Sequence, residues 1–425
     1  MQEAVGNSSH KVRTGVVASL MAVCVIGLVT LGSAERVSDS HGPTARELQI
    51  ALASSIRFTP AAGAKNVPPD QPIAIASELG HLTRVHVRST DGSNVNGRWN
   101  PATGQWKSRG VLAYDTVYRV TATVTGASHL LAQTTAAFRT LAPTNRVTAS
   151  VFPTDGMSVG VGQPIVFTFS QPVPPSARAG LARHIIVAVS GAPVAGGWHW
   201  FNDHELHYRP KALWPSGRKV TVVWALNGWN AGGGSWGDGV GATHFTIGDS
   251  HVAIANLASF TMTVTDNGRV VATYPISGGR PTDPTMGGTH IVLDRESVVR
   301  MISSSNGIPV NSPDGYDELV YDDVHISDSG EYVHAAPWSV GSQGHTNVSH
   351  GCINISPDNA LAFMNLSRIG DIVKVIGGPR PPELGDHGVM DWDTPFSEWT
   401  LATNPNAPVP PPSPSSHSHV ALTVR

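Results

Sequence analysis

The sequence predicts a mainly β protein: two immunoglobulin-like β-sandwich domains followed by a third β-rich domain with a short helix. Its 425 residues exceed the size of one ordinary domain. Glycine (44) and proline (32) are frequent. Short segments in which apolar and polar residues alternate lie between turns, and the sequence has no long amphipathic helical pattern. The net charge of −3 and the charged fraction of 14% indicate no nucleic-acid partner.

An apolar run occupies residues 14–34, directly after Lys11 and Arg13. The run is about long enough to span a bilayer, and the flanking positive charge places residues 1–13 in the cytoplasm. Gly32-Ser33-Ala34 also resembles a signal-peptidase site, so residues 14–34 are either a retained membrane anchor or a cleaved signal peptide. Both interpretations place the remainder in the cell envelope outside the cytoplasm, either membrane-anchored or secreted to the wall.

Residues 35–50 are predicted as a polar linker, and two similar stretches follow at 51–143 and 144–249. Residues 70–75 match residues 162–167, and 97–99 match 196–198. Each stretch holds short strands between Gly, Pro and Asn turns, which suits an immunoglobulin-like sandwich. We expect the two to be a spacer that holds the next domain off the membrane. Core packing is the favoured role of their tryptophans, and weak glycan binding is the alternative, for Trp99, Trp106, Trp198 and Trp200.

The third domain is predicted at residues 250–378. Asp266-Asn267-Gly268 predicts a hairpin turn, and Pro357 predicts the first turn of a helix with Leu361, Met364 and Leu366 facing inward. Residues 379–403 are expected to dock on this domain, because Trp392, Phe396 and Trp399 share one helical face. Residues 404–425 are rich in Pro and Ser and predict a disordered tail.

Cys352 is the only cysteine outside the apolar run, which contains Cys24. It lies in a polar loop, Ser349-His350-Gly351-Cys352, with His334 further upstream. A lone thiol with histidines near it in sequence indicates a nucleophile and its base. A buried free cysteine that acts as a small apolar residue is the alternative.

The Ser349-His350-Gly351-Cys352 motif, with Asn354 after it and His334 before it, resembles the signature of the L,D-transpeptidase (YkuD) catalytic domain. The resemblance is to the mycobacterial type with N-terminal Ig-like domains. It implies an acyltransferase in which a cysteine thiolate attacks a peptidoglycan stem tetrapeptide, releases D-Ala and passes the acyl group to a second stem as a 3→3 crosslink. With water as acceptor, the same site would be an L,D-carboxypeptidase. A non-catalytic wall-binding protein is a further alternative.

The resemblance also implies roles for individual residues. Cys352 would be the nucleophile and His334 the general base and acid, oriented by the backbone carbonyl of Ala335. The backbone N–H groups of Gly351 and Cys352 would bind the oxyanion. His350 would brace the loop or act as a second catalytic histidine. The substrate-binding residues would be Tyr316, Met301, Trp338, Ser349 and Asn354.

The chemistry of the thiol adds one expectation and one competing interpretation. A cationic neighbour is needed to form thiolate at neutral pH. The resemblance implies in addition that β-lactams of the carbapenem type are covalent inhibitors. The competing interpretation is a zinc site formed by His334, His345, His350 and Cys352. Their spacing matches no standard zinc pattern, so we expect no metal and no cofactor.

Overall fold

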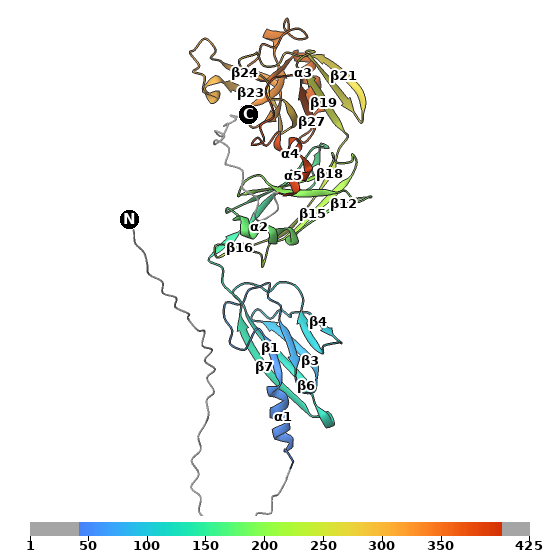
Figure 1. The fold of residues 1–425 in the computed structure, drawn as a ribbon, viewed down its shortest axis with the longest axis vertical. Coiled ribbons are helices and arrows are strands. Elements are labelled where there is room, and N and C mark those ends of the chain that lie inside the picture. Colours follow the sequence, from blue (N-terminus) through green and yellow to red (C-terminus); the bar gives the residue numbers. More distant parts are fainter. Residues whose placement is uncertain (1–41, 402–425) are drawn as a thin grey trace, which may run out of the picture. The chain divides into compact units, whose positions relative to one another are not determined.

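The computed structural model describes residues 42–401, so the predictions for residues 1–34 and 404–425 lie outside the described residues. Most of the ordered structure is strand, arranged as two sandwiches and a third domain with two sheets, which confirms the predicted fold class (Figure 1). Within residues 42–401, no helix has the length and apolar character needed to cross a membrane.

The first described element is a helix, α1 (Ala45–Ser54), where the sequence predicts the end of a linker. Thr44 and Glu47 form a capping box. The Glu47 carboxylate accepts from Thr44 N at 2.7 Å, and Glu47 N donates to Thr44 Oγ1 at 3.3 Å. The Thr-x-x-Glu spacing is visible in the sequence, and the helix begins inside the predicted linker of residues 35–50.

The first sandwich packs two sheets around a core that includes Ile75, Trp106 and Val120. One sheet has the order β1-β2-β5-β4 and the other β3-β6-β7. The strands are β1 (Ile56–Thr59), β2 (Ala74–Ser77), β3 (His81–Ser89), β4 (Gly97–Asn100), β5 (Gln105–Ser108), β6 (Val117–Thr125) and β7 (Leu131–Arg139), with the 3₁₀ turn η1 (Ala127–His129) between the last two.

The second sandwich has an aromatic core that includes Phe167, Phe169 and Trp200. Its sheets have the orders β10-β18-β15-β12 and β13-β14-β11-β9, and β16-β17-β8 form a small third sheet. The elements are β8 (Asn145–Val147), β9 (Ala149–Phe152), β10 (Ser158–Val159), β11 (Ile165–Phe169), α2 (Pro175–Leu181), η2 (Ala182–His184), β12 (Ile185–Val189), β13 (Gly196–Trp200), β14 (Glu205–Pro210), β15 (Lys219–Ala225), β16 (Asn230–Gly232), β17 (Ser235–Gly237) and β18 (Val240–Ile247).

The third domain contains the sheets β21-β20-β19-β27-β22 and β23-β24-β25-β26. Asn267 and Gly268 take positive φ in the predicted turn between β20 and β21. Its elements are β19 (His251–Asn256), β20 (Thr261–Asp266), β21 (Arg269–Pro275), β22 (Gly288–Ile291), β23 (Asp294–Ile302), η3 (Ser303–Asn306), β24 (Asp317–Ser327), β25 (Glu331–Ala335), η4 (Pro337–Ser339), β26 (Ile353–Ile355), α3 (Pro357–Leu366) and β27 (Ile372–Ile376).

Helix α3 begins at Pro357 as predicted, and its inward face agrees with the prediction in part. Ala360 and Phe363 are its buried residues, whereas Leu361 is 48% exposed. The helix packs on β24 and β25, and Ala360 and Phe363 share one face at i,i+3 spacing. Met364 and Leu366 are partly buried against the core, as predicted, so the prediction is wrong for Leu361 alone.

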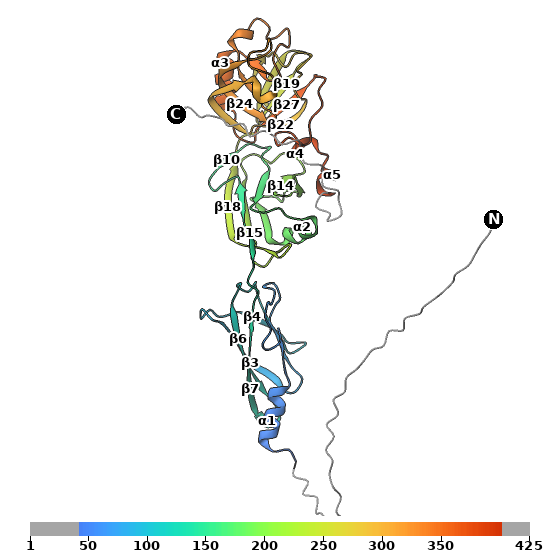
Figure 2. The ribbon, with the colours of Figure 1, turned by 90° about the vertical axis from the view of Figure 1, so that its left-hand side faces the viewer.

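The C-terminal segment forms α4 (Met390–Asp393) and α5 (Phe396–Leu401) and contacts two domains (Figure 2). Thr289 N donates to Asp393 Oδ2 in the third domain. The indole N–H groups of Trp392 and Trp399 instead donate to carbonyls of the second sandwich. The guanidinium of Arg209 lies 4.7–5.2 Å from three ring centroids, those of Trp392, Phe396 and Trp399. The sequence prediction named only one of the two docking surfaces.

Candidate active site

His334 lies in the buried strand β25 with its ring held by the backbone. Its Nδ1 is 3.0 Å from Ala335 O, and because a carbonyl only accepts, Nδ1 carries the proton. Burial lowers the pKa of His334 to about 4, with the Ala335 carbonyl opposing this shift. The imidazole is therefore neutral near pH 7, and Nε2 has a free lone pair for accepting a proton.

Cys352 is half-buried directly before β26. Burial is the main cause that raises the pKa of its thiol to about 12, and the carboxylates of Glu331 and Asp323 add to the shift. Its Sγ lies 3.8 Å from Gly330 O. The sequence-based expectation of a cationic neighbour differs from this environment, where no cation lowers the pKa of the thiol and Glu331 and Asp323 both raise it. The resting thiol is therefore protonated.

Strand pairing brings the histidine and the cysteine to one end of a sheet. β25 and β26 run parallel, with His334 opposite Asn354, and Cys352 precedes Asn354 by two residues. Cys352 lies directly before β26, whose first residue, Ile353, pairs with Val333 beside His334. Within residues 42–401, the hydrogen bonds of the two side chains go to backbone carbonyls and not to each other.

The loop before Cys352 is held together by Ser349. Its hydroxyl donates to Cys352 O at 2.6 Å and accepts from Gly351 N at 3.1 Å. Its backbone N donates to Gly278 O at 3.0 Å. Gly351 has φ +132°, a conformation that favours glycine. Because the Gly351 N–H already has an acceptor, the N–H of Cys352 is the better oxyanion donor of the predicted pair.

Asn354 also makes hydrogen bonds that hold the neighbouring segments in place. Its Nδ2 donates to Ser339 Oγ at 3.0 Å, and its backbone exchanges hydrogen bonds with Ser277 at 2.8 and 3.0 Å. Its Oδ1 is buried and has no hydrogen-bond partner. That oxygen is the part of Asn354 left to meet a substrate amide.

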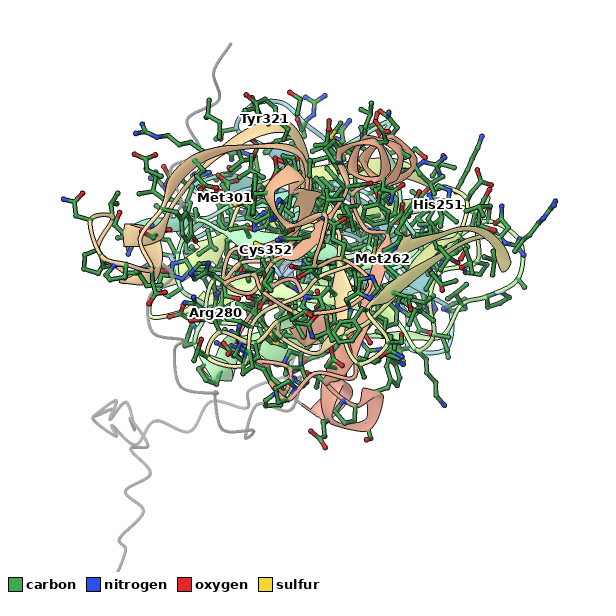
Figure 3. The ribbon with its side chains drawn as sticks, turned by 90° about the horizontal axis from the view of Figure 1, so that it is seen from above. His251, Met262, Arg280, Met301, Tyr321 and Cys352 are labelled. Carbon is green, nitrogen blue, oxygen red and sulfur yellow. The ribbon has the colours of Figure 1, made fainter. Side chains whose placement is uncertain are left out.

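The remaining predicted residues border this region. The ring of Tyr316 lies 5.2 Å from that of His350, whose Nε2 is buried without a hydrogen-bond partner. Trp338 is 58% exposed, with its ring 6.1 Å from that of His334. Met301 is half-buried on β23; Figure 3 labels it together with Cys352. His345 is exposed, so it does not join the other histidines.

Comparison with known proteins agrees with this geometry. Residues 250–375 match the family model of the L,D-transpeptidase catalytic domain, and residues 64–230 match that of a bacterial Ig domain. The chain is 37% identical to L,D-transpeptidase 2 of Mycobacterium tuberculosis over 91% of this chain and 94% of the relative. The chain belongs to the L,D-transpeptidase family. L,D-transpeptidase 5 of the same organism is 28% identical over 93% of this chain and 87% of its own.

Solved L,D-transpeptidases are also similar to this chain. L,D-transpeptidase 3 from Mycobacterium tuberculosis, in complex with a faropenem-derived adduct, is 35% identical over 54% of this chain and 97% of its own, with a TM-score of 0.46. An LD transpeptidase in complex with imipenem is 37% identical over 55% of this chain and 100% of its own, with a TM-score of 0.48.

In this L,D-transpeptidase, two buried carboxyl groups near Cys352 escaped the sequence analysis. Asp323 is fully buried with both oxygens unpartnered, and burial raises its pKa to about 8. Glu331 accepts from Met286 N and Arg380 Nη1, each at 2.9 Å, while burial raises its pKa to about 7. One feature of the sequence could have indicated that Glu331 is buried. This residue occupies an alternate position of the same strand as Val333 and Ala335, which are apolar.

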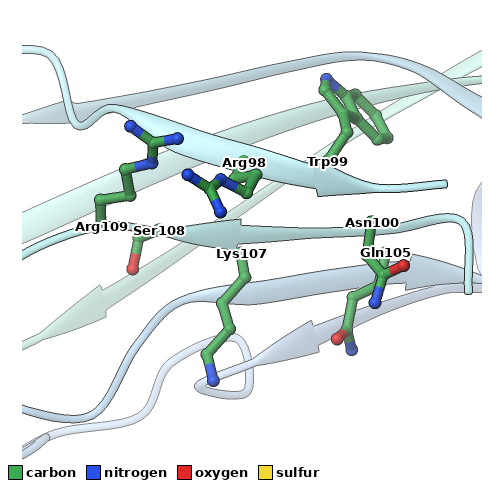
Figure 4. Close-up of a pocket in the computed structure, with 7 residues that line it drawn as sticks. All are labelled: Arg98, Trp99, Asn100, Gln105, Lys107, Ser108 and Arg109. Atoms are coloured by element: carbon green, nitrogen blue, oxygen red, sulfur yellow. The ribbon is translucent and has the colours of Figure 1, made fainter.

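A hollow lies on the surface of the first sandwich of this L,D-transpeptidase, on the hairpin of β4 and β5 (Figure 4). Its volume is about 330 Å³, and Trp99 in its wall is 40% exposed, whereas Trp106 and Trp200 are buried. The hollow is lined by Arg98, Trp99, Asn100, Gln105, Lys107, Ser108 and Arg109. Of the four tryptophans predicted as core or glycan-binding residues, Trp99 alone is placed for the second role.

Proposed function

We propose that this chain is a peptidoglycan L,D-transpeptidase that forms 3→3 crosslinks through a thioester on Cys352. The observation that carries the proposal is the parallel pairing of β25 with β26, which sets Cys352 and the Nδ1-protonated His334 at one end of the sheet. A nucleophile, a base and an orienting group are the parts that covalent acyl transfer requires.

The first half-reaction forms the acyl-enzyme. His334 Nε2 takes the thiol proton as Cys352 Sγ bonds to the carbonyl carbon of the third stem residue. The N–H of Cys352 stabilises the negative oxygen of the tetrahedral intermediate. The C–N bond to D-Ala then breaks, and the leaving nitrogen receives the proton from His334.

The second half-reaction transfers the acyl group. The side-chain amine of an acceptor stem attacks the thioester and gives its proton to His334. The new amide forms, the C–S bond breaks, and the Cys352 thiol regains the proton. If water takes the amine's place, the product is a shortened stem, so the carboxypeptidase alternative uses the same residues.

The neutral resting pair has a chemical consequence for inhibition. A strained β-lactam carbonyl reacts when a thiol is deprotonated in the same step, so carbapenems are proposed to acylate Cys352. The proposed location outside the cytoplasm, where peptidoglycan stems lie, follows from the substrate. Anchoring through residues 14–34 stays a prediction.

The test is mass spectrometry of the products formed from disaccharide-tetrapeptide. We expect crosslinked dimers and released D-Ala with the wild-type chain and with Cys24→Ala, the matched control at the other cysteine. Cys352→Ala should give neither product and no carbapenem adduct on residues 349–356. Dimers formed by the folded Cys352→Ala variant would reject the cysteine mechanism. Shortened stems without dimers would assign the carboxypeptidase alternative.

A further inference from the structure

Three potential metal ligands gather where the second sandwich meets the C-terminal segment. Glu205 and His207 lie two residues apart on β14 and therefore face the same side of the strand. His387 comes from the segment before α4. One ligand atom from each lies within 4.8 Å of the others. Across residues 42–401, this is the one group of three His, Cys, Asp or Glu side chains placed so closely.

The ring of His207 has one nitrogen with a hydrogen-bond partner and one buried nitrogen without any. The residue is 1% exposed, and its Nδ1 lies 2.9 Å from Asp391 Oδ1. Its Nε2 is buried and has no hydrogen-bond partner. A buried nitrogen without a partner costs free energy, and a metal ion bound to its lone pair would remove that cost.

His387 shares one feature with His207, a carboxylate on Nδ1, but its Nε2 already has a partner that an ion would have to separate from it. Its Nδ1 contacts the carboxylate of Asp328, and its Nε2 lies 2.7 Å from Glu205 Oε2. Each histidine thus has a carboxylate on Nδ1. This is the outer-shell pattern that orients metal-binding imidazoles and presents Nε2 to the ion.

The surroundings favour a rigid but reachable site. The ring of Phe201 stacks on His387 at 3.9 Å and on His207 at 5.4 Å. Asn202 Nδ2 donates to Glu205 Oε2 at 3.1 Å. The side chains of Glu205 and His387 remain 20% and 33% exposed, which leaves a path for a hydrated ion.

We propose that Glu205, His207 and His387 bind one Zn²⁺ ion, through two Nε2 atoms and one carboxylate oxygen, with water as the fourth ligand. Two imidazoles and a carboxylate are a ligand set that zinc accepts. Ligands about 2.0 Å from zinc lie roughly 3.3 Å apart in a tetrahedron, so shifts of about 1 Å would close the site. The ion would join β14 to the segment that leads into α4.

This site is separate from the zinc site considered in the sequence, which combined Cys352 with loop histidines. Sequence spacing did not reveal it, because His387 is distant in the chain from Glu205 and His207. Its role would be structural, since no member of the group belongs to the proposed Cys352 mechanism.

The first test is zinc binding by the full chain without an added polyhistidine tag. After chelator treatment and dialysis, titration with ZnSO₄ should show one tight site per chain, and zinc should raise the unfolding temperature. Co²⁺ in its place should give the visible absorption of a tetrahedral complex. A wild-type chain that binds no stoichiometric zinc would show a hydrogen-bonded network only and overturn the proposal.

The second test uses matched variants. His207→Gln and Glu205→Gln should each lose the tight site, whereas His204→Gln, on the exposed neighbouring histidine, should keep it. Asp391→Asn should weaken zinc binding about 10- to 100-fold through loss of the Nδ1 partner. Cys352→Ala should bind zinc as the wild type does. Tight zinc binding that survives in both His207→Gln and Glu205→Gln, or that disappears in Cys352→Ala, would also overturn the proposal.

Discussion

His334 lies directly opposite Asn354 in the parallel pairing of β25 and β26. In this register, Cys352, which directly precedes β26, lies two residues before the partner of His334. The Nδ1 of His334 is occupied by Ala335 O, so proton transfer is directed to Nε2. Neither residue depends on a mobile loop for its position, since each is in or adjacent to a strand.

His334→Ala should lower the rate of carbapenem acylation and of crosslinking about 10²- to 10⁴-fold, because general-base assistance is lost. His345→Ala removes an exposed histidine of the same loop region and should leave both rates unchanged. The measurement is stopped-flow acylation followed by intact-protein mass. If His350→Ala proves far more damaging than His334→Ala, the base is His350.

The thiol of Cys352 should become more reactive when nearby negative charge is removed. Glu331 and Asp323 both raise its pKa, after burial itself. Asp323→Asn should therefore shift the pH profile of alkylation by iodoacetamide to lower pH. Asp70→Asn, at an exposed aspartate of the first sandwich, is the control. An unchanged profile in Asp323→Asn would show that the carboxyl does not act on the thiol.

Asp323 should also make the folded state less stable as the pH rises. Its folded pKa of about 8 lies above the ordinary value of 3.8, so its favourable contribution is complete below about pH 4 and is lost between pH 4 and pH 8. For a fully buried carboxyl, the loss is on the order of a few kcal/mol. Urea unfolding at pH 5 and pH 8 should show a smaller pH-dependent loss in Asp323→Asn than in the wild type and Asp70→Asn. Equal losses in all three would disprove the assignment.

Ser349→Ala should damage the nucleophile loop, although the sequence assigned Ser349 to substrate binding. The hydroxyl bridges Gly351 N and Cys352 O, and no other side chain within the described residues makes both bonds. Losing both bonds should lower the stability by about 1–3 kcal/mol. Thermal unfolding and acylation kinetics should both change, whereas a pure substrate contact would alter only the kinetics. Ser342→Ala is a matched control on the preceding turn.

The second sandwich should be needed for stability, contrary to a pure spacer role. Gly160 N and Gly162 N donate to Ile369 O and Gly370 O at 2.8 Å, and the Trp399 side chain is fully buried against the sandwich. A fragment of residues 144–401 should unfold and react with a carbapenem like the full chain. A fragment of residues 250–401 should unfold at a lower temperature. Identical behaviour of both fragments would restore the spacer interpretation.

Local sequence patterns predicted those parts of the structure that depend only on residues near one another in the chain. Alternation and turn residues gave the hairpin around Asn267 and Gly268, and Pro357 gave the start of α3. The motif around Cys352 indicated the site. Contacts between distant segments were missed. Asp323 lies on β24, which pairs with β23, and Trp399 is covered by the second sandwich. The spacing of residues within one segment of the chain cannot predict either contact.

The protonated state of the Cys352 thiol affects how fast oxidants react with it. Peroxides attack thiolates far faster than thiols, so a cysteine whose pKa is about 12 is a poor target at neutral pH. The chain also offers no second cysteine beyond Cys24 for a disulfide. The high pKa of the thiol therefore protects the proposed nucleophile from oxidation between turnovers, and in the proposed mechanism it is exposed to oxidants only while His334 holds its proton.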